Sequence, residues 1–268
     1  PDVVTRSGTN VAGCTAITAD LATPGVANRV LASAAVVYQC AQPEYHRWPQ
    51  EFPPLQAAIL DAAATHDALL VVVDNLYGYG PVHGAYREDL PLAAETRKGR
   101  VRADMWRSLE SAHRAGRCRV VAARASTFYG PGVTGSVLGE RAFGPLVRGR
   151  PAQLLGDPDR LHSVTYVPDL AATMVRLACE PEAWGRAWHV ANAPATTTAD
   201  LVRTAARLAG VEPRWRAMGR SMLRIGGVFT PAARELVEMF YEVAHDHVVA
   251  RIHQRRRHQQ QRGGRAGG

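Results

Sequence analysis

The chain has 268 residues, of which 46% are hydrophobic and 21% are charged, and this balance is typical of a folded protein with a sizeable core. No apolar run reaches the ~18 residues that a membrane-spanning helix needs, and no secretion signal opens the chain. The formal net charge of +8 falls to +2 when the six arginines of residues 251–268, a stretch without acidic residues, are set aside. We therefore expect a cytoplasmic protein with neither a membrane span nor a nucleic-acid partner.

The first half of the chain alternates apolar strands with helical patterns. We expect strands at residues 3–5, 14–19, 34–38, 68–73 and 119–123, and helices at residues 55–66 and 98–115. Continuous apolar strands separated by helices are typical of a parallel sheet that is covered on both faces. Right-handed crossovers between such strands produce a doubly wound α/β fold.

After Gly132 the strands shorten and Gly and Pro become more frequent, which indicates a smaller α/β region. We expect a strand at residues 187–190 and helices at residues 169–179, 198–208, 222–228 and 232–243. As domains, residues 1–132 form a first unit to which 164–180 return, residues 133–163 and 181–245 form a second, and residues 246–268 form a basic disordered tail.

The cysteines and the carboxylates do not suggest a metal centre. Cys14, Cys40, Cys118 and Cys179 are widely spaced and include no C-x-x-C pair, so we expect reduced thiols rather than a disulfide framework or a zinc site. No carboxylate pair has the spacing of metal ligands, and we predict no metal.

Four motifs in the chain follow one another in a recognisable order. They are Asp74–Pro81 (D-N-L-Y-G-Y-G-P), Glu88–Pro91 (E-D-L-P), Arg124–Gly132 (R-A-S-T-F-Y-G-P-G) and Tyr166–Ala171 (Y-V-P-D-L-A). In order and spacing they resemble the motifs of the NAD-dependent epimerase/dehydratase family of extended short-chain dehydrogenase/reductases. The resemblance covers residues 1–245 and implies a Rossmann-type dinucleotide domain followed by a smaller substrate region. It also implies NADP or NAD as cofactor, and epimerisation, dehydration or reduction of a small or nucleotide-sugar-like substrate.

One motif of that family, the Gly-rich phosphate turn G-x-x-G-x-x-G, does not occur in the chain. If residues 3–5 are the second strand of the dinucleotide unit, the first strand and its turn belong to about 30 residues that precede Pro1. The resemblance therefore implies that the first βα unit is missing and that the Rossmann-type domain is N-terminally truncated. The alternative is a different, complete fold that begins at Pro1.

The resemblance also places the cofactor and substrate contacts. Arg6 and Ser7 stand where the family usually has an acidic residue, so we expect them to bind the 2′-phosphate of NADP, although Arg6 is alternatively a solvated loop residue. Substrate contacts are implied for Thr127 and His162. Further cofactor contacts are implied for Asp20, Leu21, Cys40, Ala41, Gln42, Arg100 and Ser126.

The catalytic positions depart from the family pattern. The family places a tyrosine and a lysine four residues apart on one helix, after a serine at a strand end. Alignment puts Thr96 at the tyrosine, Arg100 at the lysine and Asn75 at the serine. Threonine is too weak an acid to transfer protons near neutral pH, whereas arginine keeps the positive charge and asparagine can still form a hydrogen bond.

Two tyrosines are alternative proton donors, and two function classes remain open. Tyr77 and Tyr79 lie near the end of a predicted strand, although Tyr79 also fits a packing role, and we expect Lys98 to be solvated. The first class is an NAD(P)-dependent epimerase, dehydratase or reductase with an atypical proton relay. The second is a non-catalytic NAD(P)-binding sensor or scaffold, and an inert fragment is a third reading. By analogy with the family, helices 55–66 and 101–115 are candidates for a homodimer contact.

Overall fold

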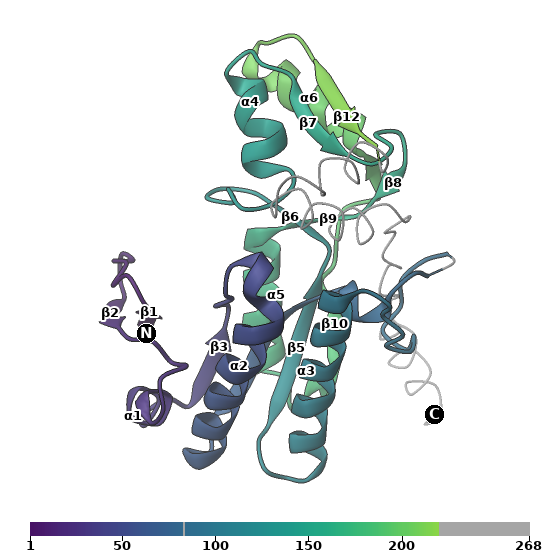
Figure 1. Cartoon of the computed structure of the whole chain (residues 1–268). Coiled ribbons are helices and arrows are strands. Elements are labelled where there is room, and N and C mark those ends of the chain that lie inside the picture. Colours follow the sequence, from purple (N-terminus) through teal and green to yellow (C-terminus); the bar gives the residue numbers. More distant parts are fainter. Residues whose placement is uncertain (83, 220–268) are drawn as a thin grey trace, which may run out of the picture.

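The computed structural model describes residues 1–82 and 84–219, so the expected helices at 222–228 and 232–243 and the tail at 246–268 lie outside the described residues. Four parallel strands form the central sheet in the order β10 (Ala187–His189), β5 (Val120–Ala125), β4 (Leu69–Asn75) and β3 (Val36–Gln39). Helices α2 (Trp48–Thr65) and α3 (Arg97–Arg114) cover one face, and α5 (Val167–Ala178) covers the other (Figure 1). The expected α/β fold with a parallel sheet is confirmed.

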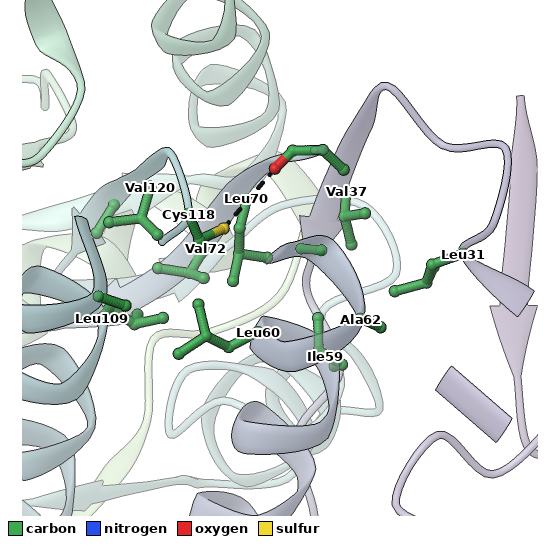
Figure 2. Close-up of a cluster of buried hydrophobic side chains, with 14 of the residues drawn as sticks. Leu31, Val37, Ile59, Leu60, Ala62, Leu70, Val72, Leu109, Cys118 and Val120 are labelled. Carbon is green, nitrogen blue, oxygen red and sulfur yellow. Dashed lines mark hydrogen bonds between the residues drawn. The ribbon is translucent and has the colours of Figure 1, made fainter. Parts of the chain in front are cut away.

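Strand β4 shows why both faces of the sheet carry helices. Leu70 and Val72 belong to the cluster of buried side chains beneath α2 and α3 (Figure 2). Leu69 and Val71 belong to the cluster on the opposite face, beneath α5. Since successive side chains of a strand alternate between the two faces, a continuous apolar run buries both of them.

Helix α2 begins at Trp48, well before the expected start at residue 55. Pro49 lies in the first turn, where its missing N–H costs no hydrogen bond, but Pro53 and Pro54 lie inside the helix and disguise it in the sequence. The buried side chains of Trp48 and Phe52 pack against each other with ring centroids 5.5 Å apart. Both side chains also cluster with Met105 of α3, and this packing holds the first turns of α2 against α3.

Strands β1 (Asp2–Thr5) and β2 (Thr15–Thr18) pair in parallel with each other and form a separate two-stranded sheet. The short helix α1 (Val26–Val30) connects them to β3 and packs on α2 (Figure 1). Among the described residues, β3 has β4 as its only strand partner and is therefore an edge strand. Val36 and Tyr38 of this edge are 37% and 43% exposed, which is unusual for apolar side chains of a parallel sheet.

The smaller region lies beyond the carboxyl ends of the central strands (Figure 1). Its elements are β6 (Thr127–Tyr129), a π-helical turn (Gly139–Phe143), α4 (Gly144–Val147), β7 (Ala152–Leu155), β8 (Leu161–His162), β9 (Val164–Tyr166), β11 (Thr196–Thr197), α6 (Thr198–Ala209) and β12 (Trp215–Met218). Strands β6 and β9 pair in parallel, as do β7 and β12, whereas β8 and β11 are antiparallel. A separate cluster that includes Leu146, Leu154 and Val202 is its core.

Helix α5, at residues 167–178, packs on the central sheet although it follows strands of the smaller region. Within residues 1–82 and 84–219, no helix combines the length and the apolar character needed to cross a membrane.

Candidate functional site

A cavity of about 490 Å³ opens at the carboxyl ends of β3, β4 and β5. In open α/β sheets, this edge is where ligands bind, close to the point at which the strand order reverses. The strand ends contribute Gln39, Asp74, Asn75 and Ala125 to its lining. The other parts of the lining are Cys40–Gln42, Tyr45, Trp48, Phe52, Val73, Leu76, Tyr77, Arg102, Ser126–Phe128, Gly132–Val137, His162, Val167, Leu170, Ala171 and Met174.

A buried carboxylate with two arginines lies beside this cavity. Asp74, 5% exposed, accepts hydrogen bonds from Arg102 Nη2 at 2.6 Å through Oδ1 and from Arg124 Nε at 2.7 Å through Oδ2. Burial by itself would raise the pKa of Asp74, but the charges and hydrogen bonds of the two arginines outweigh it and lower the pKa. The carboxylate is therefore ionised at neutral pH, and it fixes both guanidinium groups.

Arg124 also belongs to a hydrogen-bond network that includes Tyr79 and His189. Arg124 Nη1 donates to Tyr79 Oη at 2.8 Å, and Tyr79 Oη lies 2.9 Å from His189 Nε2. Burial lowers the pKa of His189 and raises that of Tyr79. Tyr79 is 1% exposed and does not line the cavity. Its position therefore agrees with a packing role rather than with proton transfer to a bound substrate.

Arg102 is the cation that reaches the cavity. Its Nε and Nη2 bind Asp74 Oδ1, Nη2 also donates to Val73 O at 3.0 Å, and the guanidinium lies 4.6 Å from the ring centroid of Phe52. No described residue accepts a hydrogen bond from Nη1. Arg102 thus lines the cavity and has one donor group that its contacts with the described residues leave available.

The aligned positions Thr96 and Arg100 do not line the cavity. Thr96 is the N-cap of α3, and its Oγ1 accepts a hydrogen bond from the N–H of Gly99 at 3.0 Å. Arg100 is exposed and donates to the carbonyl oxygen of Glu95. The helix therefore points both residues away from the site at which the alignment expected them.

Lys98 and Arg102 occupy the inward face of α3 instead. They are 2% and 6% exposed, and their four-residue spacing places them on one side of the helix. Lys98 Nζ lies 4.2 Å from the ring centroid of Tyr45, which lines the cavity. The expectation that Lys98 is solvated is wrong. The apolar stripe through Met105 and Leu109, extended backwards by helical spacing, would have identified this face.

Asn75 and Tyr77 both line the cavity, in agreement with their expected location at a strand end. The N–H of Tyr77 donates to Asn75 Oδ1 at 3.1 Å, so the amide side chain is anchored by the loop that carries the tyrosine. Tyr77 also packs near Trp48, with ring centroids 6.0 Å apart. Of the two tyrosines considered as proton donors, only Tyr77 reaches the cavity.

Thr127 and His162 come together from β6 and β8, although 35 residues separate them. Thr127 Oγ1 lies 2.6 Å from His162 Nε2, and both residues line the cavity. Burial lowers the pKa of His162 to about 4, so its imidazole is neutral at physiological pH. Ser126, also in the lining, donates its hydroxyl to Ser163 O at 2.5 Å, which fixes the start of β6.

The residues expected on the cofactor side fall into two groups. Cys40, Ala41 and Gln42 follow β3 and line the cavity. Sequence reasoning missed their neighbour Gln39, a buried residue of the lining whose Oε1 has no hydrogen-bond partner. The group beside the β1–β2 sheet does not line the cavity and consists of Arg6, Ser7, Asp20 and Leu21.

The residues beside the β1–β2 sheet differ in exposure. Arg6 and Ser7 are exposed in the turn after β1. Asp20 is also exposed, and its Oδ1 accepts a hydrogen bond from the N–H of Ala22 at 3.0 Å. Leu21 packs against the core beneath α2 and α3. Among the described residues, no group of three or more His, Cys, Asp or Glu side chains is arranged to hold a metal ion.

Comparison with known proteins bears on the fold. No protein-family model matches the chain, and no curated protein sequence matches it. Solved structures do match. The fold is that of the NAD-dependent epimerases and dehydratases. UDP-glucose 4-epimerase from Thermus thermophilus, in complex with NAD, is 16% identical with a TM-score of 0.67, and the match covers 87% of this chain and 86% of that one.

Two further solved structures show the same similarity. dTDP-glucose 4,6-dehydratase from Bacillus anthracis, in complex with NAD, is 15% identical with a TM-score of 0.66 and covers 88% of this chain and 82% of that one. UDP-glucuronic acid 4-epimerase from Bacillus cereus, in complex with UDP-glucuronic acid and NAD, is 17% identical with a TM-score of 0.65. The match covers 78% of this chain and 70% of that one. At such identities the similarity concerns the fold.

Replacing Asp74 by Asn should destabilise the protein strongly. The change leaves two buried guanidinium groups without their carboxylate, and removing one partner from a buried ion pair costs about 3–5 kcal/mol. Asp104→Asn is the matched control, because Asp104 pairs with Arg107 on the surface, where an ion pair contributes about 0–1 kcal/mol. Urea denaturation measures both, and equal losses would contradict the role given to Asp74.

The burial of His162 should make stability depend on pH. Its pKa is about 4 in the folded protein and ~6.5 when unfolded, so the unfolded state binds more protons below pH 6.5. The free energy of unfolding should therefore decrease as the pH falls from 7 to 5, by about 2 kcal/mol for this residue. Urea titrations of His162→Gln should show a smaller decrease in the free energy of unfolding over this pH range. His46→Gln, which alters an exposed side chain, is the control and should show the same decrease as the wild-type protein.

Proposed function

We propose that this protein binds NAD(P) at the carboxyl edge of the central sheet and uses it for oxidation–reduction chemistry on a small molecule in the cavity. The observation that carries the proposal is the position of Arg102, a buried cation on α3 that lines a cavity at the ends of β3, β4 and β5 and whose Nη1 has no acceptor among the described residues. The fold of solved NAD complexes supports the choice of cofactor.

The residues present fit a nicotinamide cofactor. Arg102 supplies donors for ribose hydroxyl oxygens, and its charge is held in place by Asp74. Gln39 Oε1 is a buried acceptor without a partner in the protein, and it suits the amide N–H of a carboxamide. The bound cofactor would donate or accept hydride. The protein would position the reacting groups and exclude water through the apolar lining.

Asn75 and Tyr77 are the residues that we propose for handling the substrate oxygen and its proton. The amide of Asn75, anchored by the N–H of Tyr77, can hydrogen-bond an oxygen in the cavity. The phenol of Tyr77 can donate or accept a proton there, which the cap residue Thr96 cannot do. Arg102 rather than Arg100 takes the role that the family gives to its lysine.

The edges of β1 and β3 support the view that one more βα unit belongs to this fold. The described strands run β2–β1 in one sheet and β3–β4–β5–β10 in the other. Dinucleotide-binding sheets have the order 3-2-1-4-5-6. Here β2 and β1 correspond to strands 3 and 2 of that order, and β3, β4 and β5 correspond to strands 4, 5 and 6, so strand 1 is the one without a counterpart among the described strands. We propose that this first parallel strand lies between β1 and β3. Arg6 and Ser7 would then lie at the same edge as Gln39, where they could bind the 2′-phosphate of NADP.

Hydrogen exchange tests the additional strand. In the chain of residues 1–268, the β3 amides that do not bond to β4 should exchange rapidly, because β3 is an edge strand. In a chain that also carries the proposed βα unit, the same amides should exchange at least tenfold more slowly. The amides of β4 serve as the internal control in both samples. Equal exchange of the β3 amides in the two samples would show that no strand pairs with this edge.

A non-catalytic NAD(P)-binding protein is the second candidate function. The observation in its favour is that the inward face of α3 carries Lys98 and Arg102 and no tyrosine. Both candidates require cofactor binding, and only the first requires turnover. Cofactor absorbance followed with a panel of small ketones and alcohols separates them, since tight binding without any turnover would favour the sensor or scaffold.

Cys40 provides a test of cofactor binding that needs no activity. It is exposed and lines the cavity, while desolvation raises the pKa of its thiol, so alkylation is best measured at mildly alkaline pH. We expect NADPH to slow the alkylation of Cys40 at least fivefold, as measured by peptide mass spectrometry. Cys179, exposed and outside the cavity, is the internal control and should react at an unchanged rate.

Two arginine variants localise the effect. Arg102→Ala should raise the NADPH concentration needed for half-protection at least tenfold, because it removes the donor in the cavity wall. Arg100→Ala, two residues along the same helix and exposed, should leave it unchanged. Circular dichroism checks that Arg102→Ala remains folded, and Arg102→Lys provides a second variant that keeps the charge. If Arg100→Ala and not Arg102→Ala weakens the protection, the cofactor is bound by the residue at the aligned lysine position, and the role proposed for Arg102 is wrong.

A further inference from the structure

We infer that the substrate of this site is a small, uncharged molecule with an apolar ring and one carbonyl or hydroxyl oxygen, and not a nucleotide-linked sugar. The inference rests on the proposed function, in which the cavity holds the reacting end of the cofactor, and it names the class of substrate beside it. Three properties of the lining carry it: an aromatic wall, the pairing of the two charged side chains among the described residues with each other, and one partly buried polar pair.

The aromatic wall comes from the start of α2 and from the loop after β4. Trp48 packs edge-on against Phe52 and against Tyr45, with ring centroids 5.5 and 5.0 Å apart, and all three residues line the cavity. Tyr77 extends the same group. Flat rings that already pack at such distances offer edges and faces to another ring, so an aromatic or alicyclic substrate suits this wall.

The charges of the lining oppose a phosphorylated ligand. Among the described residues that line the cavity, only Asp74 and Arg102 are charged, and they bind each other at 2.6 Å. Arg124, the second cation on Asp74, donates to Tyr79 and lies outside the lining. A diphosphate placed against this lining would lose its hydration without gaining an unpaired cation, which is strongly unfavourable, so the lining suits the nicotinamide end of the cofactor and not its diphosphate.

The polar pair Thr127–His162 provides a place for one oxygen. The two side chains lie 2.6 Å apart in the lining, on β6 and β8. The neutral imidazole of His162 bonds the Thr127 hydroxyl, which can still accept or donate one further hydrogen bond according to the tautomer of the imidazole, so it accommodates a carbonyl or a hydroxyl without requiring a charge on the ligand. The remaining neighbours in the lining include the apolar side chains of Phe128, Leu170 and Met174.

The size of the cavity agrees with a small substrate. Its volume of about 490 Å³ lies in the lower half of the ~300–1,000 Å³ that small-molecule sites occupy. Part of this volume is needed for the nicotinamide end of the cofactor. The remainder suits a molecule of one ring with a short side chain rather than a nucleoside diphosphate with a hexose.

Acetophenone, an uncharged aromatic ketone, and UDP-glucose are the two probes that test this inference. Saturation-transfer NMR on the chain of residues 1–268 should show saturable binding of acetophenone and none of UDP-glucose at the same concentrations. Val133→Asp, a partly buried loop position in the lining, should weaken acetophenone binding at least tenfold. Val147→Asp, 56% exposed on α4 and outside the lining, is the matched control and should not change it.

Saturable binding of UDP-glucose at or below the concentration required for acetophenone would overturn the inference. So would the absence of acetophenone binding, or equal binding by Val133→Asp and the wild-type chain when circular dichroism shows both to be folded. The Cys40 alkylation assay keeps the two proposals apart. If NADPH protects Cys40 and acetophenone does not bind, the substrate class is wrong and the cofactor site stands; the reverse result removes the cofactor site alone.

Discussion

The candidate site depends on one buried ion group, the carboxylate of Asp74 with the guanidinium groups of Arg102 and Arg124. Asp74 is the penultimate residue of β4, and each of its oxygens binds a different arginine. Three charges in a buried location are tolerated only because they are paired and hydrogen-bonded with good geometry. The group ties β4, β5 and α3 together at the edge where the cavity opens, and it thereby sets the orientation of Arg102.

The two faces of the sheet explain why this edge is available for a ligand. Helices α2 and α3 cover one face and α5 covers the other, so the apolar strands are buried along their length (Figure 1). The carboxyl ends remain uncovered, and there the smaller region contributes Thr127 and His162. The site is thus built from strand ends and loops that a rigid core positions, which is where functional residues concentrate in α/β folds.

The chemistry of the site differs from the pattern of the family that it resembles. A tyrosine on α3 would need to face the cavity, but the inward positions of that helix hold Lys98 and Arg102, and the phenol that reaches the cavity is Tyr77 after β4. The aromatic residues of α2 and the paired state of Arg102 leave the described lining largely apolar. An apolar lining of this kind favours binding by shape and ring packing over binding by charge.

The sequence by itself determined the layers of the fold and much of the site. Apolar runs such as residues 69–73 are typical of a parallel sheet with helices on both faces, and the ends of such strands meet at one edge. Residues near the strand ends, among them Cys40, Asn75 and Thr127, could therefore be assigned to one site from their order in the chain together with the family resemblance. The apolar stripe through Met105 and Leu109 indicates which face of α3 points inward, but only the tertiary structure decided that Arg102 of this face, and not the aligned Arg100, lines the cavity, because the carboxylate of Asp74 holds Arg102 there. The pairing of Asp74 with arginines 28 and 50 residues away, and the unpartnered Gln39 in the cavity wall, depend on long-range contacts that local sequence patterns do not encode.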